Sequence, residues 1–299
     1  MDRLPFIDVL DEERRYSRTT ELREFEYSYQ AEITNIYSLR EKENLYQIQL
    51  LDPEERRNFT FLPGQFVMLE LPGIGEAPFS ISSSPIRHGS IELCIRNVGN
   101  LTNFLTRVKR GTKVGLSGPF GTWFPMEHME GQDILLIAGG LGIVPLRAPI
   151  FSVLENRSRY NRVDIMYGAK TPGDLLFTYQ YEMWRQFDLN LGLTVDQGDE
   201  NWDGPVGVIT NILEERIAET GSLAKNTYAI VCGPPVMFKF VCDMLIKAGM
   251  PMRKIFVSLE RRMHCGRGKC CRCNIGSTYT CLEGPVFDYW SVINLKEAI

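Results

Sequence analysis

Cysteine spacing near the C-terminus constrains this chain more than any other feature of its sequence. Five of the eight cysteines lie between residues 265 and 281, and four of them, Cys265, Cys270, Cys273 and Cys281, read C-x4-C-x2-C-x7-C. The first two gaps are those of plant-type 2Fe-2S ligation. Thiols that cluster in a cytosolic protein more often bind metal than form disulfides. The spacing therefore predicts a 2Fe-2S cluster held by these four side chains.

A structural zinc site with four cysteine ligands is the alternative interpretation, because C-x2-C pairs also occur in such sites. Zinc sites usually combine two C-x2-C hairpins, whereas the first gap here contains four residues. Gly266 and Gly268 in that gap let the backbone bend and direct N–H groups at the sulfurs, which stabilises a negatively charged cluster. Cys271 as a ligand would give C-x5-C-x-C, which fits neither class.

Length and charge limit the remaining possibilities. The 299 residues suffice for two domains of roughly 150 residues each. A net charge of −4 gives no basic footprint for nucleic acid. The longest apolar stretch, residues 134–146, is shorter than the roughly 20 residues that span a bilayer, and the N-terminus lacks the apolar region of a signal peptide. We therefore expect a cytoplasmic protein without a membrane span.

The first part of the chain has short strand signals separated by glycine and proline turns. Such a series favours a closed or sandwiched antiparallel sheet, interrupted here by one helical stretch at residues 101–108. The predicted strands are residues 29–37, 45–51, 65–71, 79–82, 91–96 and 113–116.

From about residue 131, apolar strand signals alternate with helical ones, which indicates a doubly wound parallel sheet. The predicted strands are residues 134–138, 163–167, 191–195, 228–232 and 255–259, and the predicted helices are residues 144–156, 175–186, 209–220 and 236–248. The last 40 residues are too few for a large core, so a metal centre would have to stabilise them.

Three turns are candidates for ligand binding, the first and the third of them for a phosphate group. Glycines between a strand and a helix let the backbone approach a pyrophosphate, and the helix N-terminus offers free N–H groups. One such turn holds Gly139, Gly140 and Gly142, although it lacks the G-x-G-x-x-G pattern, and a tight turn without ligand is the alternative. A second turn follows Cys232, itself more often a core residue than a reagent. In the third, Gly99 and Thr102 suit a phosphate or merely cap their helix.

Taken in this order, the motifs resemble the ferredoxin-NADP reductase superfamily. Within it, they resemble the electron-transfer subunits that end in a 2Fe-2S segment, as in dihydroorotate dehydrogenase, anaerobic sulfite reductase and the cytoplasmic sulfhydrogenases. The resemblance covers about residues 29–290. Residues 1–26 are rich in charge and are expected to be an N-terminal extension. The resemblance implies an antiparallel β-barrel FAD domain at 27–128, a doubly wound NAD(P) domain at 129–259 and a 2Fe-2S segment with its tail at 260–299.

The resemblance also implies site residues. Phe79 would pack on the isoalloxazine and Ser80 would bond near flavin N5, while Ala77 stands where the family usually has an arginine facing the pyrophosphate. Arg96 and the amides at residues 99–102 would then carry that contact. No acid–base residue is assigned; Ser80 and Cys232 are the side chains expected nearest the reacting rings. The implied FAD contacts are Pro78, Phe79, Ser80, Ile81, Arg96, Gly99, Leu101 and Thr102. The implied NAD(P) contacts are Gly139, Gly140, Gly142, Ile143, Pro145, Lys170, Cys232, Gly233 and Pro234.

The function implied is a two-to-one electron conversion. NAD(P)H would give hydride to FAD, and single electrons would leave through the 2Fe-2S cluster to an iron–sulfur or hydrogenase-type partner subunit, or one of sulfite reductase. Tyr289 and Trp290 are expected to anchor that partner. Lys170 favours a 2′-phosphate or is simply solvated, so NAD against NADP stays open.

Three alternatives are a free-standing ferredoxin-NAD(P) reductase, an oxygenase reductase and a zinc-stapled nucleotide-binding regulator. An oxygenase reductase carries a full ferredoxin domain, for which the last 40 residues are too few. A visible spectrum separates a redox protein from a zinc-stapled regulator, since only the redox protein absorbs through flavin and iron–sulfur groups.

Overall fold

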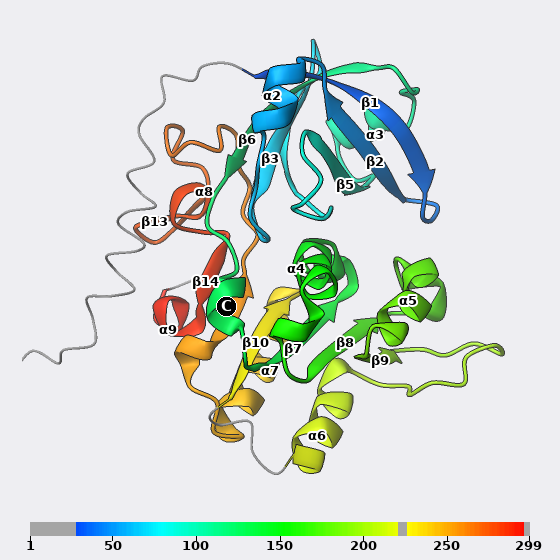
Figure 1. The fold of residues 1–299 in the computed structure, drawn as a ribbon, viewed down its shortest axis with the longest axis vertical. Coiled ribbons are helices and arrows are strands. Elements are labelled where there is room, and N and C mark those ends of the chain that lie inside the picture. Colours follow the sequence, from blue (N-terminus) through cyan, green and yellow to red (C-terminus); the bar gives the residue numbers. More distant parts are fainter. Residues whose placement is uncertain (1–27, 221–225, 296–299) are drawn as a thin grey trace, which may run out of the picture.

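Two six-stranded sheets organise the chain, one above the other in Figure 1. The computed structural model describes residues 28–220 and 226–295. Residues 29–120 build the first sheet, and residues 133–288 build the second. The predicted extension at residues 1–26 lies outside the described residues.

The first sheet is antiparallel throughout, as the sequence predicted. Its strand order is β4-β3-β6-β1-β2-β5. Just after β4, Ser82 donates its N–H to the carbonyl of Glu92 on β5 at 2.9 Å, so the two edge strands approach each other. The strands are β1 (Tyr29–Ser38), β2 (Glu43–Leu50), β3 (Phe66–Leu71), β4 (Gly75–Ser80), β5 (Ser90–Arg96) and β6 (Lys113–Phe120).

Strand β3 is buried on both faces. Val67 and Leu69 point into the core of the first domain. Phe66 and Met68, on the opposite face, pack against Cys273 and Cys281 of the C-terminal segment. Because side chains alternate along a strand, β3 separates the interior of the first domain from the cysteines.

Two short helices complete the first domain. The predicted helix is present as α3 (Asn100–Leu105), which buries Leu101 and Leu105 in the core. Helix α2 (Pro53–Asn58) was not predicted. It begins at Asp52, whose carboxylate accepts the N–H groups of Glu54 and Glu55, as an N-cap does.

The second sheet has the order β14-β11-β10-β7-β8-β9, and its first five strands in sequence are parallel. The doubly wound prediction is therefore confirmed. Its strands are β7 (Asp133–Gly139), β8 (Val163–Ala169), β9 (Leu189–Val195), β10 (Thr227–Cys232), β11 (Ile255–Ser258) and the antiparallel β14 (Val286–Asp288). Its helices are α4 (Ile143–Glu155), α5 (Tyr181–Gln186), α6 (Ile209–Thr220) and α7 (Pro235–Lys247).

Helices cover both faces of the second sheet. On β7, Ile134 and Leu136 belong to the core shared with α4 and α5. Leu135 and Ile137 belong to the core shared with α6 and α7. Both faces of β7 are therefore covered by apolar side chains, which explains why its sequence is a continuous apolar run.

The helix predicted at residues 175–186 forms only at its end, as α5. Two 3-10 turns, Pro172–Asp174 and Thr178–Gln180, precede it. Between them Phe177 is buried with a left-handed φ of 57°. An α-helix cannot pass through such a residue, so the backbone turns there instead. The strand predicted at 79–82 is also shifted, because β4 ends at Ser80.

The C-terminal segment contacts both sheets, and Figure 1 shows it in orange and red beside them. Thr122, after β6, accepts the N–H of Val286 at its hydroxyl oxygen and donates that hydroxyl to the Val286 carbonyl. Its elements are β12 (Asn274–Ile275), β13 (Thr278–Tyr279), α8 (Thr280–Glu283), β14 and α9 (Tyr289–Val292). Nowhere in the described residues is a helix both long and apolar enough to cross a bilayer.

Candidate cofactor sites

Two of the four predicted cysteines pack against β3. Cys273 and Cys281 are 2% and 1% exposed and belong to a small core with Phe66, Met68 and Met263. Cys265 and Cys270 are half-buried. The thiol of Cys270 is hydrogen-bonded to that of Cys265, and the thiol of Cys273 to that of Cys281. The side chains thus form two thiol pairs.

The loop between the first two cysteines supplies backbone donors. The N–H of Arg267 lies 3.4 Å from the Cys265 Sγ, and the N–H of Gly268 lies 3.1 Å from the Cys281 Sγ. Gly266 has a positive φ of 67°, and a Cβ there would lie 3.0 Å from the side chains of Met68 and Phe120. The bend that aims these N–H groups therefore needs glycine, as the sequence predicted.

The pKa values of Cys265 and Cys281 move in opposite directions. Burial raises the pKa of the Cys265 thiol, but hydrogen bonds from the backbone of Arg267, Lys269 and Cys270 outweigh it and bring that pKa to about 7. Burial raises the pKa of Cys281 to about 12, and a hydrogen bond with Cys273 adds to this. Cys281 therefore stays protonated unless a cation takes the place of its proton.

Cys271 lies apart from the four. Its side chain is exposed, its φ is 56°, and its Sγ lies 3.3 Å from the Tyr279 hydroxyl. His264 is exposed too. As the side chains stand, no group of three or more His, Cys, Asp or Glu in the described part of the chain is placed to hold a metal ion.

The predicted flavin segment lies on the strand next to β3. Phe79 and Ser80 are half-buried at the end of β4, and Ser80 pairs with Phe66. Pro78 is half-buried as well, whereas Ile81 points into the core of the first domain and offers only its backbone. The segment and two of the cysteines, Cys273 and Cys281, therefore both border β3.

The predicted phosphate contacts are partly engaged inside the protein. Thr102 accepts the N–H of Gly99 at 2.8 Å and that of Val98 at 3.0 Å, so its hydroxyl caps its own helix. Arg96 forms an ion pair with the buried Glu43, and the side chain of Leu101 lies in the core. The backbone of residues 99–102 remains the candidate phosphate contact at this turn.

Two buried polar atoms in the first domain have no hydrogen-bond partner among the described residues. They are the Ser83 Oγ, three residues after Ser80, and the Asn97 Oδ1, two residues before Gly99. Neither residue was selected from the sequence. Buried polar atoms are normally hydrogen-bonded. A polar ligand bound beside these two segments would supply the missing partner of each atom.

The two predicted nucleotide turns meet at the carboxyl edge of the second sheet. A Cβ on Gly142 would lie 2.0 Å from the Cys232 carbonyl oxygen, and one on Gly139 would lie 2.6 Å from the Met237 Sδ. Gly140 has a φ of 55° with no atom within 4 Å of its Cβ position, so its outer side is open. Gly233 lies against Gly139 and Pro234 is exposed beside it, while Ile143 and Pro145 are buried in α4.

Cys232 contributes only its backbone to the second predicted nucleotide turn. Its thiol is buried, contacts the Ser258 carbonyl at 4.0 Å, and has a pKa raised by burial. It is therefore a core residue. Lys170 is exposed just after β8, where Gly168 pairs with Gly139, so it shares the edge with the glycine turn.

Sequence reasoning missed a polar group between the two domains. Arg147 of α4 is buried against Glu92 of β5 and Gln180. The signal for it was the single charged residue in an otherwise uncharged helical stretch, residues 143–154. The partners could not be identified, because 55 residues separate Arg147 from Glu92.

The sequence matches three family models along its length. Residues 30–124 match the oxidoreductase FAD-binding domain and residues 136–243 the oxidoreductase NAD-binding domain. Residues 260–293 match the iron-sulfur cluster binding domain of dihydroorotate dehydrogenase B. The three candidate sites fall within these three matches in the same order.

Curated relatives match over most of their length. Sulfhydrogenase 1 subunit gamma of Pyrococcus furiosus is 41% identical over 273 residues, which cover 89% of this chain and 92% of that protein. A probable dihydroorotate dehydrogenase B (NAD(+)) electron transfer subunit of the same organism is 32% identical and covers 79% of this chain and 83% of its own.

Solved structures share the arrangement of domains. A chain of an NADH-dependent reduced ferredoxin-NADP oxidoreductase superposes with a TM-score of 0.67 at 24% identity, covering 91% of this chain and 93% of that one. The ferredoxin reductase in carbazole 1,9a-dioxygenase gives a TM-score of 0.63 at 25% identity over 77% of this chain and 68% of its own.

Proposed function

Because the chain belongs to the FAD- and NAD-binding oxidoreductases of ferredoxin reductase type that carry an iron–sulfur domain like that of dihydroorotate dehydrogenase B, a family that includes the sulfhydrogenase gamma subunits, we propose its specific role. It is the subunit that exchanges hydride with NAD(P)H and passes single electrons through a 2Fe-2S cluster. The cluster exchanges these electrons with a redox partner such as a hydrogenase or sulfite reductase subunit.

The position of β3 carries this proposal. The flavin segment lies on β4, hydrogen-bonded to β3, and Phe66 and Met68 of β3 pack on two of the cysteines. Ser80 pairs with Phe66, and directly opposite residues of an antiparallel pair present their side chains on the same face. A flavin at Ser80 and a cluster at Cys273 would therefore both border Phe66. This supports the order nicotinamide, flavin, cluster.

The bound groups supply the conversion of a hydride pair into single electrons. The chain positions them: Phe79 offers a stacking face and Ser80 a hydroxyl at the end of β4. The glycine turn at residues 139–142 offers an open backbone at Gly140, just before α4. No side chain has to hold or move a proton.

We assign the cluster to Cys265, Cys270, Cys273 and Cys281. The donor set fits, because it consists of two thiol pairs with two backbone N–H groups aimed at sulfur. Such N–H groups stabilise the negative charge of an iron–sulfur cluster and raise its potential. Cys271 is excluded from this set because it faces Tyr279 on the surface.

The surface around the cysteines supports a partner with acidic groups. Residues 260–272 contain five Arg or Lys and one Glu, although the whole chain has a net charge of −4. Arg262, Lys269 and Arg272 are exposed, each within three residues of a proposed ligand. Opposite charge on a partner would steer it to this face.

The two aromatic residues predicted to anchor a partner, Tyr289 and Trp290, differ in their exposure to solvent. Tyr289 is 4% exposed and lies in the core of the second domain, so that prediction was wrong for it. Trp290 is 55% exposed, with the Arg253 guanidinium 5.7 Å from its ring. Only Trp290 is available to a partner.

Gentle anaerobic isolation from the source cell tests the proposed role. We expect a native mass well above the 34.2 kDa of the chain, and NADH or NADPH should reduce the acceptor of the associated subunit. A lone chain that reduces soluble ferredoxin at full rate would instead be a free-standing reductase.

A further inference from the structure

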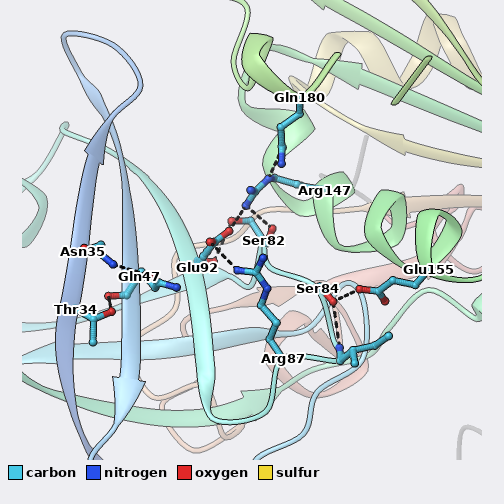
Figure 2. Close-up of polar contacts among 11 residues, drawn as sticks. Thr34, Asn35, Gln47, Ser82, Ser84, Arg87, Glu92, Arg147, Glu155 and Gln180 are labelled. Carbon is cyan, nitrogen blue, oxygen red and sulfur yellow. Dashed lines mark hydrogen bonds and ion pairs between the residues drawn. The ribbon is translucent and has the colours of Figure 1, made fainter. Parts of the chain in front are cut away.

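Arg147 links the two cofactor-binding domains from a buried position. Its Nη1 donates to the Ser82 carbonyl at 2.9 Å and to the Glu92 Oε2 at 2.6 Å, and its Nε donates to the Gln180 Oε1 at 2.9 Å (Figure 2). Arg147 is 3% exposed and Glu92 8%. Arg87 approaches the other Glu92 oxygen at 3.4 Å.

Aromatic rings enclose the guanidinium. Its carbon lies 4.8 Å from the centre of the Phe151 ring and 4.6 Å from that of Phe177. Phe177 has a left-handed φ of 57°. Such strain persists only where the surroundings hold it, and it gathers at functional sites. Arg147 and Gln180 therefore fix the strained loop that follows β8.

Stability alone does not explain this arrangement. Burying an ion pair costs desolvation, and well-packed apolar residues of similar volume serve stability as well or better. What the ion pair adds is geometry, because a guanidinium directs several hydrogen bonds from one rigid plane. At Arg147 these bonds reach three separate segments.

Two of these segments, those of Ser82 and Gln180, lie toward the proposed cofactor sites. Ser82 follows Ser80 by two residues, and Gln180 belongs to the loop after β8 at the carboxyl edge of the second sheet. Arg147 itself lies five residues after Gly142, about 7.5 Å along α4 from the nucleotide turn. One side chain thus joins the flavin segment to the helix that starts at that turn.

We propose that Arg147 is a positioning residue for hydride transfer. By holding the end of β4 against α4, it sets how the nicotinamide and flavin rings meet. This inference rests on the proposed function, since it requires both rings to be bound at these segments. Arg147 touches neither ring and acts through Ser82 and Gln180.

A second contact across the same interface provides the control. Ser84 donates its hydroxyl to the carboxylate of Glu155, on α4 like Arg147 and eight residues further along (Figure 2). Glu155 is exposed. Its hydrogen bond in the described residues is to Ser84, not to Ser82 or to the loop after β8. Glu155→Gln therefore weakens the interface without disturbing the group around Arg147.

The experiment is stopped-flow reduction of the anaerobic holoprotein by NADH or NADPH, whichever reduces the wild type faster. Arg147→Lys keeps the charge but loses the planar set of donors. We expect flavin reduction at saturating nucleotide to slow by at least about tenfold, because a misplacement of about 1 Å costs up to about a hundredfold. The nicotinamide–flavin charge-transfer absorbance should weaken. Flavin content, iron content and reduction by dithionite should stay unchanged, and Glu155→Gln should behave as wild type.

The double variant Arg147→Met with Glu92→Met guards against misfolding, because it leaves no unpaired buried charge. It should bind flavin and still be slow with nucleotide. Wild-type rates in either Arg147 variant, or the same loss in Glu155→Gln, would overturn the positioning role. A wild type that no nicotinamide nucleotide reduces would instead refute the proposed function.

Discussion

The backbone N–H of Gly268 donates a 3.1 Å hydrogen bond to the Sγ of Cys281, 13 residues further along the chain. This bond ties the loop after the first proposed ligand to the last one. It exists because Gly268 has a φ of 70°, a conformation that other residues rarely adopt. Cluster binding should therefore depend on this glycine.

Gly268→Ala should lower the iron content of the purified protein. The new Cβ would lie 2.3 Å from a Leu282 methyl group, and the left-handed backbone costs roughly 1–2 kcal/mol for a residue with a Cβ. Gly276→Ala is the matched control, since Gly276 has a φ of 57° with open space around it. Equal iron loss in both variants would show that backbone strain, not the Gly268 contact, is responsible.

The ligand set is tested by three single substitutions. Cys270→Ser and Cys273→Ser should lose the visible absorbance of the cluster, because thiolate ligands are removed. Cys271→Ser should keep it, since that thiol is exposed and faces Tyr279. If Cys271→Ser alone bleaches the spectrum, the assignment is incorrect.

Phe79→Ala should raise the dissociation constant of FAD. Loss of one aromatic stacking contact is worth about 0.5–1.5 kcal/mol, or about two- to tenfold in affinity. The measurement is flavin release on dilution, followed by fluorescence. Phe187→Ala, at a 48% exposed position of the second domain, is the control and should retain FAD. Unchanged retention in Phe79→Ala would remove that residue from the flavin site.

Charge reversal of Arg262, Lys269 and Arg272 together should slow electron transfer to an acidic ferredoxin by about tenfold or more at low salt. The wild-type rate should fall as ionic strength rises. Transfer to a small uncharged acceptor such as benzoquinone reports whether the loss is specific to a docked protein. Reversal of Arg107 and Lys109, which are exposed after α3, is the control. A salt-independent rate would argue against an electrostatic docking face.

Regular elements with a clear period could be predicted from the sequence. Helix α6 runs from Ile209 to Thr220, as predicted, because its apolar residues recur at helical spacing. The joining of the two nucleotide turns also followed, because the carboxyl ends of parallel strands meet at one edge. The set of four cysteine ligands stays a prediction from their spacing, because no group of three or more such side chains in the described residues is placed to hold a metal ion.

Features set by distant contacts could not be predicted. Strand β14 has three residues, too few to show a period, and forms because Phe287 pairs with Val257. The turn at Phe177 depends on Arg147 and Gln180, which the local sequence does not reveal. Thr102 fitted both a phosphate contact and a helix cap, and the structure shows it capping its own helix.

Metal and flavin analysis of the anaerobically purified chain, read with its visible spectrum before and after addition of NADH or NADPH, tests the central claim most directly. We expect one FAD and two iron atoms per chain, as a 2Fe-2S cluster requires, and both absorbances should bleach when nucleotide is added. Stoichiometric zinc without iron, and a spectrum that nucleotide does not change, would contradict it.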